Sequence, residues 1–97
     1  MKRENKPVTE NVGGEPYQYY PLGKYVVRAP DVCGGRPTFK YTRIEVTGTF
    51  ERLAAGEKIG DIVSGYRERV SKEAINEAVH LITTQFLASL PQLEPAA

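Results

Sequence analysis

The sequence predicts a mainly α fold, in which a trihelical helix-turn-helix core is preceded by a short β hairpin or arm. Three observations predict it. A turn rich in glycine and proline, within residues 31–44, separates two short β-like runs. After Ile44 the spacing of apolar residues changes from about two to about 3.6. Three amphipathic stretches follow, and the last two are joined by only a few residues.

The expected β elements lie on either side of this turn. Residues 24–29 are rich in β-branched and aromatic side chains and end at a proline, as a short strand does. Residues 37–44 alternate loosely between apolar and polar side chains, which indicates a second short strand or arm. Gly34 and Gly35 supply the φ freedom of a tight turn, and Pro37 excludes helix at this point.

Capping residues and apolar spacing define the three expected helices. The first begins near Glu45 and ends before Gly56, which stands where a left-handed C′ residue belongs. The second, over residues 59–66, is short and weakened by two glycines. The third and longest is capped by Ser71 and stopped by Pro91. Their stripes predict one core: Val46, Phe50, Leu53, Ile59, Ile62, Val63, Ile75, Ala78, Val79 and Ile82.

One domain is expected over residues 23–90. A flexible N-terminal extension (1–22) and a frayed C-terminus (91–97) flank it, because both ends are polar and rich in proline. The 97 residues include one cysteine, so no internal disulfide supports the small core, and self-association would do so. The sequence shows no leader and no long apolar run, so we expect a cytoplasmic protein that does not contact membranes.

Charge and motif content argue against catalysis. The formal net charge is +1, yet residues 24–52 carry six cations against three anions, which permits a basic face for phosphates or for an acidic protein. The sequence has no P-loop, dinucleotide fingerprint or metal-ligand spacing. Cys33 has no flanking histidine to activate it. We therefore expect no enzymatic activity, no cofactor and no metal.

Seven side chains are candidate contacts to double-stranded DNA: Arg36, Lys40, Arg43, Arg67, Arg69, Lys72 and Asn76. The last four lie at the turn before the third helix and at its start, where such domains meet the DNA backbone and bases. For the cations of the arm, the alternative is a solvated turn in which Arg43 pairs with an acid such as Glu45. Against DNA binding, the exposed face of the third helix is expected to offer Glu77 and His80 rather than arginines.

A second set of residues predicts a dimer or partner interface: Tyr17, Tyr19, Tyr20, Leu81, Phe86, Leu87 and Leu90. Three tyrosines are unusual in a mobile extension, because aromatic side chains gain free energy by burial. The leucines and the phenylalanine widen the stripe of the third helix beyond what one small core covers. We therefore expect a homodimer that uses the C-terminal half of this helix.

The runs DVCGGRPTFKYTRIEV, FERLAAGEKIGDIVSGY and VSKEAINEAV, in this order, resemble the small bacterial family called domain of unknown function 433. The resemblance covers residues 25–86. It implies a VapB-like antitoxin with a homeodomain-like or winged helix-turn-helix fold, often paired with a toxin of the PIN or Mut7-C-like ribonuclease type. Tyr41 stands where the family prefers glycine, so a positive φ at this position would be strained.

The sequence thus indicates a small antitoxin-like protein that binds DNA and a toxin partner as a dimer. The alternative is a protein-interaction module of the same fold that does not bind DNA, which the low net charge favours. A small enzyme has the least support, because no acid–base pair or activated nucleophile can be placed.

Overall fold

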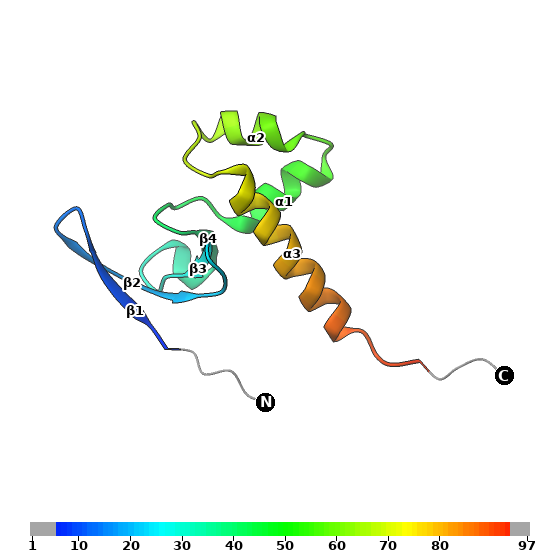
Figure 1. Ribbon diagram of the computed structural model, residues 1–97, viewed down its shortest axis with the longest axis horizontal. Coiled ribbons are helices and arrows are strands. Elements are labelled where there is room, and N and C mark those ends of the chain that lie inside the picture. The colour runs from blue at the N-terminus through cyan, green and yellow to red at the C-terminus, as the bar shows by residue number, and fades with distance from the viewer. Residues whose placement is uncertain (1–5, 94–97) are drawn as a thin grey trace.

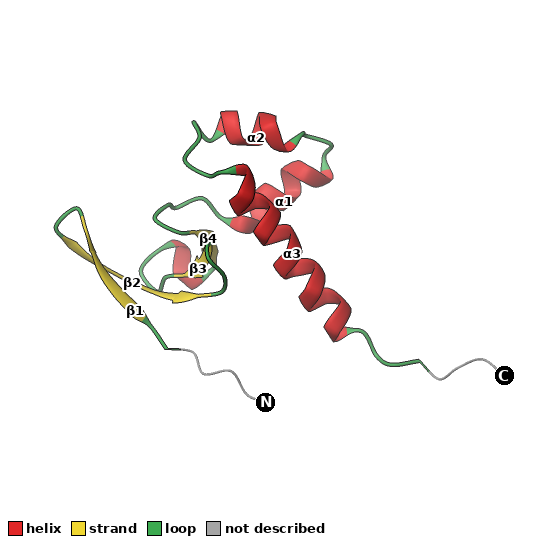
Figure 2. Cartoon of the chain, in the orientation of Figure 1, coloured by secondary structure: helices red, strands yellow, loops and turns green. Residues whose placement is uncertain are grey.

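Residues 6–93 are described in the structure, a computed structural model, and they begin with an antiparallel sheet of four strands (Figure 1). Each strand pairs with its neighbour in sequence, in the order β1-β2-β3-β4. The strands are β1 (Val8–Val12), β2 (Glu15–Pro21), β3 (Val26–Arg28) and β4 (Pro37–Phe39). Three helices follow: α1 (Val46–Ala54), α2 (Ile59–Gly65) and α3 (Lys72–Ser89). The protein is therefore a mixed α/β fold (Figure 2).

The expectation of a mainly α fold with a short hairpin or arm is wrong, because the N-terminal residues form half of the sheet. Strands β1 and β2 lie within the segment 1–22. Gly13 and Gly14, with φ of 60° and 85°, form the two-residue turn between them. The side-chain oxygen of Asn11 accepts a hydrogen bond of 3.0 Å from the amide of Gly14. Two glycines between extended segments are a hairpin signal, but β1 is too polar to show a buried face.

The expected strand over residues 24–29 is present as β3, whereas the strand expected over 37–44 ends at Phe39. A short 3-10 turn, η1 (Cys33–Gly35), joins β3 to β4. The predicted limits of the domain stay predictions, and the parts of both flanking segments at residues 1–5 and 94–97 lie outside the described residues.

Two predicted caps are confirmed. Gly56 has a φ of 94° and follows α1, where its amide donates to the carbonyl of Leu53 and the next amide donates to that of Arg52. These two bonds define the Schellman motif. At the start of α3, the hydroxyl of Ser71 accepts a hydrogen bond of 3.1 Å from the amide of Ala74. The helix limits therefore follow from local chemistry.

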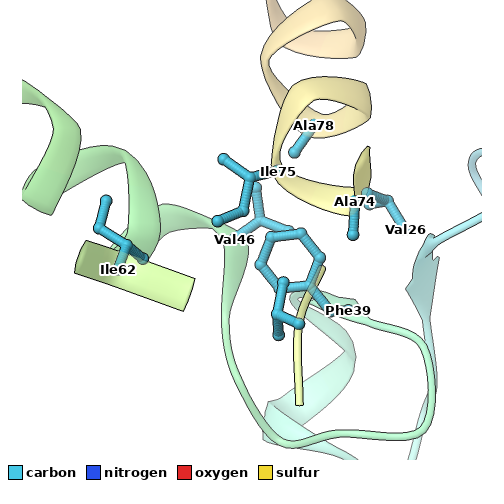
Figure 3. Packing of buried hydrophobic residues seen from close by; sticks show 8 residues of the cluster. Val26, Phe39, Val46, Ile62, Ala74, Ile75 and Ala78 are labelled. Carbon is cyan, nitrogen blue, oxygen red and sulfur yellow. The ribbon is translucent and has the colours of Figure 1, made fainter. Parts of the chain in front are cut away.

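The core lies between the sheet and the helices (Figure 3). Its buried members are Val26, Phe39, Val46, Ile62, Val70, Ala74, Ile75 and Ala78. Four other predicted core residues pack against this cluster and are partly exposed: Phe50, Leu53, Ile59 and Val63. The prediction is wrong for Val79 and Ile82, which are 36% and 52% exposed. Strands β3 and β4 cover α3 near its start, and its C-terminal half extends beyond the rest of the fold (Figure 1).

Among residues 6–93, none of the helices combines the length and the apolar character needed to cross a bilayer.

Candidate functional site

A groove of about 430 Å³ at the start of α3 gathers cations from three separate segments. Lys24 comes from the loop between β2 and β3, Lys40 from the residue after β4, and Arg69 from the turn between α2 and α3. The remaining lining residues are Tyr25, Phe39, Tyr41, Glu68, Ser71 and Ala74. The groove thus combines three cations with aromatic walls and one carboxylate, that of Glu68.

The β2–β3 loop is held in place by Glu77 of α3. Oε2 of this side chain accepts a hydrogen bond from the amide of Lys24 (2.8 Å), and Oε1 accepts from those of Tyr25 (2.7 Å) and Val26 (3.1 Å). Charge-assisted bonds of this kind are stronger than neutral ones. The expectation that Glu77 lies on an exposed face of the third helix is wrong, because the carboxylate is half-buried against the sheet. Its charge anchors the loop that carries Lys24.

A tight turn after β4 positions Lys40 and Tyr41. The amide of Lys40 donates to the carbonyl of Tyr25 (2.7 Å), which ties the turn to the loop. Thr42 closes the turn, because its amide (3.0 Å) and its hydroxyl (2.8 Å) both donate to the carbonyl of Phe39. Tyr41 has a φ of 67°, a left-handed conformation that is rare for a bulky residue. Tyr41 therefore has the positive φ that the sequence resemblance associated with strain at this position.

Tyr41 compensates for this strain through the β1–β2 hairpin. Its hydroxyl donates to Oε1 of Glu10 (2.7 Å), and its amide donates to the hydroxyl of Tyr17 (3.1 Å). Glu10 also accepts a hydrogen bond from the hydroxyl of Tyr19 and lies 3.7 Å from Nζ of Lys40. The hairpin is thereby attached to the turn that carries two of the groove residues.

The same contacts set the charges at this end of the groove. Hydrogen bonds from Tyr19 and then from Tyr41 lower the pKa of Glu10, so its carboxylate stays ionised below the usual range. Tyr19 and then Tyr41 raise the pKa of Lys40, whose ammonium lies 4.9 Å and 5.0 Å from the centres of their rings. Lys40 therefore stays protonated, and its positive charge is partly balanced by the carboxylate of Glu10.

Arg69 is positioned by the turn that ends α2. Arg67, with a φ of 54°, occupies the left-handed C′ position, and its amide donates to the carbonyl of Ser64 (2.9 Å). The amide of Glu68 donates to that of Val63 (2.9 Å), which completes a second Schellman motif. Val70 is 2% exposed. Burial of this neighbour holds the turn against the core, so the backbone of Arg69 is held beside the groove while its side chain is exposed.

Of the seven predicted DNA contacts, the structure brings Lys40 and Arg69 together in the groove. Arg36 instead forms a bidentate pair with Glu45, at 2.8 Å and 3.2 Å, which lowers the pKa of that carboxyl. The alternative pairing of Glu45 with Arg43 is wrong. The other four, which do not line the groove, are exposed: Arg43, Arg67, Lys72 and Asn76.

The predicted interface residues divide into two groups. Tyr19 is 4% exposed, and Tyr17 and Tyr20 are half-buried, so the tyrosines pack largely within this chain. Leu81 packs against the core. The exposed members lie near the end of α3: Phe86, Leu87 and Leu90, at 60%, 60% and 49%. Only this second group offers a large apolar surface to a partner.

Sequence reasoning did not find Lys24 and Tyr25 as groove residues. Lys24 is held by Glu77, which lies 53 residues further along the chain, so no local pattern connects the two. The one local indication is Gly23, because a glycine next to a strand often marks a place where another group approaches the backbone closely.

The chemistry that this groove supports best is the binding of an anion. Three cations converge from segments fixed by backbone hydrogen bonds, next to the positive end of the α3 dipole. A second hollow of about 390 Å³ has Arg28 as its one charged lining residue, and the Nε of this side chain donates to the carbonyl of Gly35 (2.8 Å). The groove at α3 is therefore the stronger candidate.

A family model described as "Protein of unknown function (DUF433)" matches residues 26–80. The match runs from β3 into α3, so it contains Lys40 and Arg69 but neither the β1–β2 hairpin nor Lys24. No curated protein and no solved structure matches the chain.

Proposed function

The chain belongs to the DUF433 family, and on that premise we propose that it is a non-enzymatic, antitoxin-like protein of the cytoplasm that binds double-stranded DNA. The observation that carries this proposal is the convergence of Lys24, Lys40 and Arg69 in one groove at the start of α3. Phosphate contacts of this kind fix a protein on duplex DNA and supply most of the affinity.

The start of α3 adds a means of reading bases. Lys72 and Asn76 are exposed and one helical turn apart, so they share one exposed face of α3. The asparagine amide can form a bidentate pair with adenine in the major groove, while the lysine contacts a neighbouring phosphate. The groove residues would thus set the position of α3, and Asn76 would provide sequence preference.

The proposal is tested by measuring the affinity of the full chain for duplex DNA across a salt series. Three phosphate contacts predict a slope of log K against log salt of about −2.7, because each contributes about −0.9. The duplexes should include the chain's own promoter region and a random sequence of the same length. Equal affinity for both would contradict sequence-specific binding, and a flat salt dependence would contradict binding through the groove.

Single-charge variants locate the contact. Arg69→Ala removes one groove cation and should reduce the slope by about 0.9. Lys58→Ala is the matched control, because Lys58 is also exposed but precedes α2, at the opposite end of this helix from Arg69. The control should leave the slope unchanged, and equal effects of the two variants would show that the groove is not the contact.

The proposal also includes a homodimer and a toxin partner of the PIN or Mut7-C-like ribonuclease type, which the family resemblance implies. The exposed apolar end of α3 supports a protein interface, because surfaces of this kind mark interaction sites. Co-expression with a ribonuclease-like protein encoded next to this chain tests the toxin partner. A stable complex with reduced ribonuclease activity is expected, whereas full activity in the presence of excess chain would contradict it.

A further inference from the structure

One apolar stripe runs along α3 and is covered by the chain itself only at its start. Ile75 is fully buried, and Val79, Ile82, Phe86 and Leu90 continue from it at steps of four, three, four and four residues. Their exposures are 36%, 52%, 60% and 49%. From Ile75 to Phe86 the steps alternate between four and three residues, as is typical of the seam along which two helices pack, and Leu90 follows at the C-cap of α3. The stripe that packs inside the core therefore extends into a surface that lacks a partner within residues 6–93.

A hollow of about 250 Å³ adjoins this stripe between α1 and α3. Phe50 of α1 lines one side, and Leu81 and Ile82 of α3 line the other. Phe86 lies one helical turn beyond Ile82 and is the largest exposed side chain of the stripe. The same patch thus carries both a hollow and a projecting aromatic ring.

Charge favours a second copy as the occupant. Residues 78–93 contain no Asp, Glu, Lys or Arg, and the lining of the hollow is also uncharged. A surface without charges meets its own copy without repulsion, whereas a charged partner would find no complement here. A two-fold interface uses the same patch on both subunits, so the patch must be complementary to itself. A projecting side chain and a hollow within one patch meet this requirement.

We propose that a second copy of this chain covers the stripe, with the two α3 helices antiparallel about a two-fold axis and Phe86 of each subunit in the hollow of the other. The antiparallel arrangement follows because the hollow adjoins the body of the fold and Phe86 lies toward the end of the helix. This inference rests on the proposed function only because that function includes a homodimer, and it identifies the surface through which the dimer forms.

The test is sedimentation equilibrium of the full chain from about 1 μM to about 1 mM, on the wild type and two variants. Phe86→Asp places a charge in the hollow and should weaken the dimer by at least about tenfold. Thr84→Asp is the matched control: Thr84 is exposed on the same helix, but residues two apart face different directions, so its dimer should keep the wild-type affinity. Circular dichroism of Phe86→Asp should show native helix, because the side chain is 60% exposed and contributes little to the fold of one subunit.

A wild type that stays monomeric over this range overturns the inference, and so do equal effects of the two variants. If the chain is monomeric alone and Phe86 is needed only for binding the ribonuclease-like protein, the stripe is the binding surface for that protein instead, and the dimer proposal is wrong. If the chain is a monomer that binds DNA with the expected salt slope, the dimer proposal is wrong and the DNA proposal is kept. If the chain is a dimer without salt-dependent affinity for DNA, the DNA proposal is wrong and the dimer proposal is kept.

Discussion

Glu77 and Gly23 approach so closely that a Cβ on Gly23 would lie 2.6 Å from Oε1 of Glu77. The carboxylate cannot move aside freely, because the three amides that follow Gly23 hold it. Gly23 is therefore required by the approach of α3 to the β2–β3 loop. This contact connects the helix to the sheet and places Lys24 at the groove.

Removing the carboxylate should destabilise the fold and the groove together. Glu77→Ala leaves three backbone amides without their acceptor and should lower the free energy of unfolding by about 2–3 kcal/mol, measured by urea denaturation. Gly23→Ala should also destabilise the wild type, but it should cost little in the Glu77→Ala background, where the new methyl group has space. Additive effects in this double-mutant cycle would contradict a direct contact.

Arg67 offers a route to higher stability. It occupies a left-handed C′ position, with a φ of 54°, where glycine is preferred. Arg67→Gly should raise the free energy of unfolding by about 1 kcal/mol. The left-handed conformation costs a residue with a Cβ about 1–2 kcal/mol, and the greater conformational entropy of glycine in the unfolded state offsets part of the stabilisation.

Arg67→Ala separates backbone strain from loss of charge. It removes the same cation but keeps a Cβ, so thermal unfolding should show no stabilisation. If both variants were stabilised equally, charge repulsion at the α2–α3 turn would be the cause, and the strain argument would be wrong.

The caps, the three helices and half of the buried core could be predicted from the sequence because they depend on residues close together in the chain. Gly56 and Ser71 illustrate this, since each acts on a helix that begins or ends beside it. The four-stranded sheet could not be read, because β1 is polar and its role depends on Glu10 meeting Tyr41, 31 residues away. For the same reason only Lys40 and Arg69 of the groove cations were identified. Lys24 depends on a contact with α3 that no local pattern shows.

Thr38 in β4 predicts a second stabilising substitution. Its side chain is fully buried, and its hydroxyl has no hydrogen-bond partner among the described residues. A buried, unpaired hydroxyl costs about 1–3 kcal/mol, so Thr38→Val, which keeps the shape, should raise the free energy of unfolding by about 1 kcal/mol. Thr42→Val is the control: this hydroxyl donates to the carbonyl of Phe39 and accepts from the amide of Ile44, so its loss should destabilise. Destabilisation by both variants would show that the Thr38 hydroxyl is paired in solution.

Acid should release the β1–β2 hairpin before it unfolds the rest of the protein. The pKa of Glu10 is lowered in the folded state by hydrogen bonds from Tyr19 and Tyr41, relative to an ordinary value of 4.5. A carboxyl with a lowered pKa stabilises the fold above its unfolded pKa, and that stabilisation is lost as the pH falls through the folded value. The protection of amides in β1 and β2 against hydrogen exchange, relative to the intrinsic rate at each pH, should therefore fall below about pH 4.5, with a smaller change in α3.

Glu10→Gln isolates this group, because the pKa of Glu45 is also lowered, by its pair with Arg36, and acid weakens that contact too. In the Gln variant the hairpin amides should exchange faster than in the wild type at pH 7, because the tyrosine hydroxyls lose a charged acceptor. The additional loss of their protection in acid should then disappear. An acid response of the hairpin that persists unchanged in Glu10→Gln would assign the transition to Glu45 or to another carboxyl.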